Sequence, residues 1–95
     1  MSGARIHLMS LTEVDFFRIL PVAVEPCRYT VAADTVLVHC PQGMAHIRIS
    51  AEAPRRIASL SFPVLKVAIE FSEMSEPESQ AFLERFDRAF HRGGG

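Results

Sequence analysis

The stretch VLVHCPQGMAHIRIS, residues 36–50, contains three side chains that could do chemistry close together: His39, Cys40 and His46. Imidazole nitrogens and thiolate sulfurs bind transition metals, and an imidazole beside a thiol can activate it as a nucleophile. A metal site needs three or four ligands, and the sequence has none of the spacings CxxC, HxxxH or HExxH. We therefore interpret the stretch as a β-hairpin, and a metal or small-ligand site centred on His39 and His46 as the alternative hypothesis.

The register of this hairpin decides how close the two histidines lie. A two-residue turn at Gln42-Gly43 would place the apolar members on one face, namely Val36, Val38, Cys40, Ala45, Ile47 and Ile49. His39 would then face His46 on the polar side, about 5 Å away. Because register follows the buried face, we favour this pairing. The alternative is a type I turn through Pro41 with a bulge at Gly43, since proline suits the first central position of such a turn.

Cysteine chemistry elsewhere has weaker support. Cys27 precedes Arg28, whose positive charge would favour a thiolate, but the sequence places no histidine base beside it. Nucleophilic catalysis requires such a base, so we predict that neither cysteine is a catalytic nucleophile. Capping accounts for Ser10 and Ser75, and we therefore assign no catalytic residue and no cofactor.

The C-terminal Gly-Gly offers a second alternative function. It resembles the tail that sulfur carriers and ubiquitin-like modifiers use after adenylation, which would make the chain a carrier protein. In those families the tail follows the last strand of a β-grasp core, whereas here it follows a predicted helix.

Composition limits the remaining functions. The chain has 95 residues, 48% hydrophobic and 22% charged, with a net charge of −1. This is typical of one small soluble domain and argues against a general nucleic-acid binder, which needs a dense basic surface. Only Tyr29 is a candidate for stacking on a base of single-stranded RNA. We expect no membrane association, because the apolar runs are far shorter than the ~20 residues of a span. We recognise no signal peptide and therefore expect a cytoplasmic location with reduced thiols.

The N-terminal part predicts one helix. Residues 1–4 are expected to be disordered, and residues 5–9 to form a short strand or an extended lead-in. Ser10 and Glu13 have the spacing of a capping box, and Pro21 should end the helix because the residue before a proline avoids the helical region. The expected apolar stripe comprises Leu11, Val14, Phe16, Phe17 and Leu20.

The middle of the chain predicts a sheet. Strands are expected at residues 27–32, 35–40, 44–50, 55–62 and 64–72, with Pro63 separating the last two. β-branched residues and period-two alternation support each strand. The short intervals favour an antiparallel meander, because parallel crossovers need a dozen or more residues.

The C-terminal part predicts a long amphipathic helix. Ser75 and Glu78 form a capping box at its start, Gly93 suits the position after its end, and residues 93–95 are expected to be disordered. Its apolar stripe comprises Phe82, Leu83, Phe86, Ala89 and Phe90. This stripe should cover the apolar face of the sheet.

These elements predict an α+β fold in a single domain spanning residues 1–95. It is a four- to five-stranded antiparallel meander, with a short N-terminal and a long C-terminal helix packed on one face. The other face would be exposed or pair with a second subunit, and would carry His39, His46, Arg48, Ser59, Ser61, Lys66 and Glu70. We predict a small non-catalytic accessory or interaction module that binds a protein partner or itself. The residues expected to contact the ligand or partner are His39, His46, Arg48 and Lys66.

Overall fold

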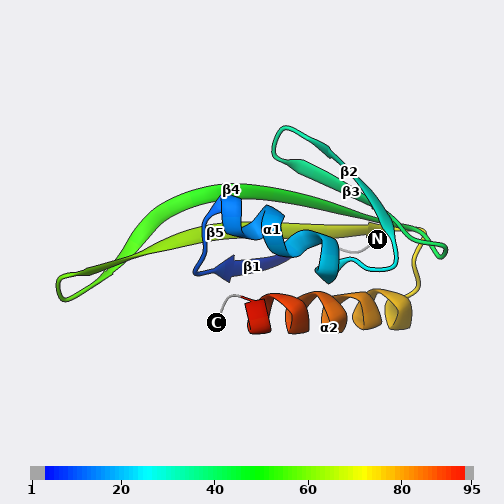
Figure 1. Cartoon of the computed structure of the whole chain (residues 1–95). Helices are drawn as coiled ribbons and strands as arrows, with labels where there is room; N and C mark the ends of the chain where they lie inside the picture. The colour runs from blue at the N-terminus through cyan, green and yellow to red at the C-terminus, as the bar shows by residue number, and fades with distance from the viewer. Residues whose placement is uncertain (1–3, 94–95) are drawn as a thin grey trace.

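A five-stranded antiparallel sheet with two helices on one face makes up the computed structural model, which describes residues 4–93 (Figure 1). The elements are β1 (Arg5–Met9), α1 (Glu13–Ala23), β2 (Arg28–Ala32), β3 (Thr35–His39), β4 (Met44–Ile57), β5 (Leu60–Ser72) and α2 (Glu76–Gly93). This confirms the predicted α+β fold, and residues 5–9 form a strand rather than an extended lead-in. The disorder expected at residues 1–3, 94 and 95 and the proposed Gly-Gly tail lie outside the described residues, while Gly93 is the last residue of α2.

The strand order is β1-β5-β4-β3-β2. Strands β2 to β5 form the predicted meander of consecutive hairpins, and β1 pairs with the free edge of β5. Alternate side chains of the central strands are buried beneath the helices, namely Val36, Val38, Ala45, Ile47, Ile49, Leu65, Val67 and Ile69. Because successive side chains of a strand point to opposite faces of the sheet, the residues between these buried ones face away from the helices.

The hairpin between β3 and β4 has neither of the two predicted registers. Cys40 and Gly43 exchange two backbone hydrogen bonds, of 2.9 and 3.2 Å, so Pro41 and Gln42 are the central turn residues. Val38 consequently pairs with Ala45 rather than with Ile47 or His46. The reason is Pro41, which has no N–H to donate to a strand partner and whose fixed φ suits the first central turn position. The favoured register was wrong by two residues, and a shift of two leaves every side chain on its predicted face.

Gly43 closes this turn against the end of β5. A Cβ atom at this position would lie 2.4 Å from the Ser72 carbonyl oxygen and 2.8 Å from the backbone carbonyl of Glu73. We expect Gly43→Ala to lower the free energy of unfolding by about 1–3 kcal/mol, because backbone cannot move aside as a flexible side chain does. Urea denaturation followed by circular dichroism measures this loss. Gln42→Ala, at the exposed neighbouring position, is the control, and equal stability of the two variants would contradict the steric explanation.

Strands β4 and β5 continue past the body of the domain as a two-stranded arm, which we define as residues 52–63. Every residue of the arm is exposed, and it accounts for the elongated extents of 46 × 25 × 25 Å (Figure 1). The predicted separate strand at residues 55–62 was wrong, because the chain reverses at Ala58, which has a φ of 57°. The predicted break at Pro63 was also wrong. Strands tolerate proline at a free edge or beside a bulge. Pro63 meets both conditions, because each strand of the arm has one free edge and the pairing with β4 is irregular between Glu52 and Arg55.

Helix α1 begins and ends later than predicted. Its N-cap is Thr12, whose hydroxyl oxygen accepts a hydrogen bond of 3.2 Å from the Asp15 N–H, so the predicted box of Ser10 and Glu13 was wrong. Pro21 lies within the helix, which continues to Ala23. The missing N–H of proline costs one helical hydrogen bond, and burial of Ala23 and the C-cap Val24 in the core offsets that cost.

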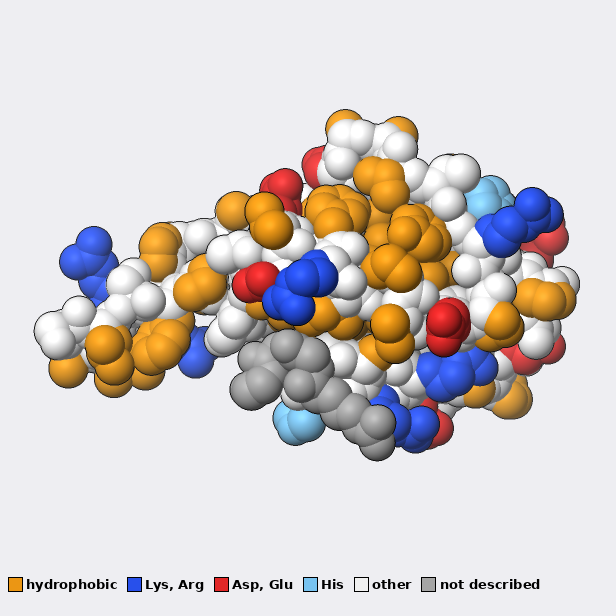
Figure 2. All heavy atoms as spheres, viewed as in Figure 1, with side chains coloured by type: hydrophobic (Ala, Val, Ile, Leu, Met, Phe, Trp, Pro, Cys, Tyr) orange, Lys and Arg blue, Asp and Glu red, His pale blue; other side chains and the backbone are white. Residues whose placement is uncertain are grey.

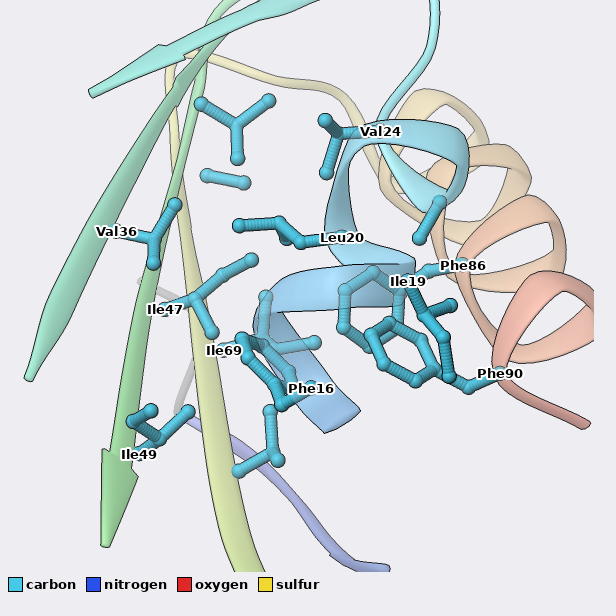
Figure 3. Close-up of a cluster of buried hydrophobic side chains, with 14 of the residues drawn as sticks. Phe16, Ile19, Leu20, Val24, Val36, Ile47, Ile49, Ile69, Phe86 and Phe90 are labelled. Atoms are coloured by element: carbon cyan, nitrogen blue, oxygen red, sulfur yellow. The ribbon is translucent and has the colours of Figure 1, made fainter. Parts of the chain in front are cut away.

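The hydrophobic core lies between the sheet and both helices (Figure 3). The second capping box is confirmed, since the Ser75 N–H donates to Glu78 and the Glu78 N–H donates to Ser75. The α2 stripe is confirmed as well, but it does not cover the sheet alone. Phe16 of α1 lies 5.0 Å from Phe90 and 6.4 Å from Phe86, measured between ring centroids. Val14, predicted in the α1 stripe, is instead 76% exposed.

Candidate functional site: the outer sheet face and the arm

The outer face of the sheet, opposite the helices, is the candidate site. Within residues 4–93, both helices pack on the other face, and alternation places the four predicted contact residues on the outer one. Arg48 lies between Thr35 and Ala68, and Lys66 lies between Leu8 and Ser50. Both long side chains can therefore reach a partner that lies against the sheet.

The two histidines are not opposite each other. His39 pairs with Arg28 and Met44, whereas His46 pairs with Leu37 and Glu70. They are diagonal neighbours, which corresponds to a separation of roughly 7–8 Å rather than 5 Å. Among the described residues there is no group of three or more histidine, cysteine or acidic side chains that could hold a metal ion. Direct pairing of His39 with His46, on which the metal hypothesis depended, is thus wrong.

Several other predicted positions differ as well. Ser61 pairs with Arg56 on the side of the arm away from the outer face, and Ser59 lies in the turn. Tyr29 pairs with Val38 and packs against the core, so it is not available on the outer face to stack on a base. Arg28 points outward beside His39, away from the partly buried Cys27.

Sequence reasoning missed an apolar strip that runs along the outer face into the arm. We call it the outer strip; it comprises Ile6, Leu8, Ile57, Leu60, Phe62 and Val64. Leu8 is 62% exposed and Leu60 is 60% exposed. Figure 2 shows hydrophobic side chains gathered at the end of the arm, on the left of the view. Such a grouping of exposed large apolar side chains marks an interaction surface in folded proteins.

Pairing along β5 makes the outer strip continuous. Leu60, Phe62 and Val64 are alternate residues of β5, and the irregularity in the ladder falls on β4, so the alternation along β5 is unbroken. Ile57 pairs with Leu60 at the arm tip. At the other end, Leu8 of β1 pairs with Lys66, the next outward residue. The alternation of apolar residues in LSFPVLKVAIEF, residues 60–71, could have predicted this strip. Pro63 was interpreted as a break between two strands, so the alternation was not followed across it. The pairing of β1 with β5 had no local signal.

A groove on the helix side brings together residues far apart in sequence. His7 lies on the inner side of β1, with its Nδ1 atom 3.7 Å from the Asp87 Oδ1 atom of α2. Ser10 and His91 line the same groove. This distance is longer than that of a hydrogen bond, so Asp87 does not orient the His7 imidazole as it would a catalytic base. The contact is an ion pair only when the imidazole is protonated.

Neither described helix is long and apolar enough to cross a membrane. No family model, curated protein or solved structure matches the chain.

Proposed function

We propose that the protein is a non-catalytic interaction module whose outer strip binds the outer strip of a second copy of the chain. The supporting observation is the arm. It extends a two-stranded ribbon into solvent with Ile57, Leu60 and Phe62 on one side, 55%, 60% and 37% exposed. An isolated two-stranded ribbon is at best marginally stable in water, so contact with a partner would stabilise it.

A second copy suits this surface better than an unrelated partner because the strip can complement itself. Two-fold symmetry brings the same patch of each subunit together and is the commonest arrangement of soluble oligomers. The arm end of one strip, with Leu60, would then lie against the sheet end of the other, with Leu8. Arg55 beside Phe62 and Glu52 beside Val64 supply opposite charges for this arrangement. We further propose a cytoplasmic location.

The expected affinity is moderate. Burial of a large apolar side chain contributes about 1.5–3 kcal/mol, while association itself costs about 4–15 kcal/mol. Because the members of the outer strip are already partly buried, we expect a dissociation constant in the micromolar range.

Sedimentation equilibrium over the micromolar concentration range tests the proposal. We expect the wild type to be a reversible dimer, and Leu60→Glu/Phe62→Glu to raise the dissociation constant at least roughly a hundred-fold, because two apolar contacts are lost and two charges are introduced. Circular dichroism establishes that the variant is folded.

The matched control is Val14→Glu/Val22→Glu. These valines are 76% and 64% exposed on α1, so the control adds the same charge on the helix side. We expect it to dimerise like the wild type. A wild type that stays monomeric at all concentrations, or a control that dissociates as much as the arm variant, would contradict the proposal.

A further inference from the structure

Cys27 and Cys40 form a close thiol pair at the end of the β2–β3 ladder. Arg28 and His39 are the last paired residues of the two strands. Cys27 directly precedes Arg28, and Cys40 directly follows His39. Their Sγ atoms lie 2.7 Å apart although 13 positions separate the residues in sequence. Directly opposed residues of antiparallel strands have Cα atoms about 4.5–5.5 Å apart, within the range of about 4.4–6.8 Å that disulfides require.

The pair is accessible although it packs against the core. Both side chains are partly buried, and Cys40 also lines a surface groove between its turn and the first half of α2. Burial, followed by the hydrogen bond between its thiol and that of Cys27, raises the pKa of Cys40 to about 12. Cys40 therefore keeps its proton at neutral pH and, because only thiolates attack disulfides, it is not the thiol that attacks first.

We propose that Cys27 and Cys40 are a redox site that closes as an internal disulfide on reaction with a small-molecule disulfide such as oxidised glutathione. The Cys27 thiolate attacks one sulfur of the small disulfide, forming a mixed disulfide and releasing a thiolate. That thiolate takes the proton of Cys40. The resulting Cys40 thiolate attacks the Cys27 sulfur, and the second small thiolate leaves and takes the proton that Cys27 had lost. The net reaction converts a protein dithiol and one small disulfide into a protein disulfide and two small thiols.

The bond would tie two segments that the fold already brings together. Cys27 ends the connection from α1 to β2, and Cys40 begins the turn through Pro41 that Gly43 closes. Because the folded chain holds the thiols together, closure should be more favourable in the native than in the unfolded chain. For a loop of this length we expect the equilibrium constant for closure to differ on the order of a hundred-fold between them.

Intact-mass spectrometry of the full chain tests this proposal in defined mixtures of reduced and oxidised glutathione, after trapping free thiols with N-ethylmaleimide. We expect the wild type to lose two hydrogens and take up no maleimide, whereas Cys40→Ser should stop as the mixed disulfide with glutathione. In urea, closure should need a far more oxidising mixture. The proposal would be overturned if the native wild type remained fully alkylated, accumulated mixed disulfides, linked two chains together, or closed no more readily than the unfolded chain.

Discussion

Replacing Phe86 by alanine is expected to lower the free energy of unfolding by about 3–5 kcal/mol, which is the largest effect of a single substitution that we predict. The Phe86 side chain is fully buried, and its ring centroid lies 4.7 Å from that of Phe90 and 6.0 Å from that of Phe82. It also contacts Phe16, so its loss would open a cavity between the two helices. A small domain has a net stability of only about 5–15 kcal/mol, so the variant should be partly unfolded well below the denaturation temperature of the wild type.

The matched control for this prediction is Phe62→Ala, which removes the same atoms from the exposed arm. Urea denaturation at low protein concentration, where dissociation of a dimer contributes least, should show a loss of less than about 1 kcal/mol for the control. Similar losses for both variants would mean that the aromatic cluster between α1 and α2 is not the stabilising centre of the fold.

Closing the disulfide between Cys27 and Cys40 is expected to raise the free energy of unfolding by about 3 kcal/mol. The bond lowers the conformational entropy of the unfolded chain between the two cysteines. The native chain already holds their Sγ atoms 2.7 Å apart. Thermal denaturation of the oxidised and the reduced wild type, each without added thiol, measures the difference. Treatment with oxidised glutathione should give no such gain in Cys40→Ser. An oxidised wild type that melts at or below the temperature of the reduced protein would show that the native geometry does not accommodate the bond.

Local signals predicted most of the fold. The second capping box and the spacing of Phe82, Phe86 and Phe90 identified α2, because these features act within a few residues of each other. Period-two alternation assigned the central side chains to the correct faces even though the register was wrong. A shift of two residues preserves the face, so the burial pattern could not distinguish the two registers.

The proline positions were the main source of error. Pro21 was expected to end a helix and Pro63 to separate two strands, yet both lie inside their elements. In each case the three-dimensional setting decides the outcome, through burial at the end of α1 and through the free edges of the arm. Sequence alone does not contain that setting.

The sequence predicted the polar residues of the candidate site but not its apolar residues. His46, Arg48 and Lys66 were correctly placed on the outer face, but Ile6 and Leu8 join them through a pairing of β1 with β5 that spans most of the chain. The thiol pair was likewise hidden, because two cysteines become neighbours only once the β2–β3 register is known.

Isotope-filtered nuclear Overhauser measurements on a mixture of ¹³C-labelled and unlabelled chains test the central claim most directly, because they report only contacts between different molecules. At a concentration where the dimer is populated, we expect intermolecular signals from the methyl groups of Leu60 and Ile57 to those of Leu8 and Ile6. The proposed interface would be contradicted if those methyl groups gave no intermolecular signal, or if the signals came instead from Val14 and Val22 on α1.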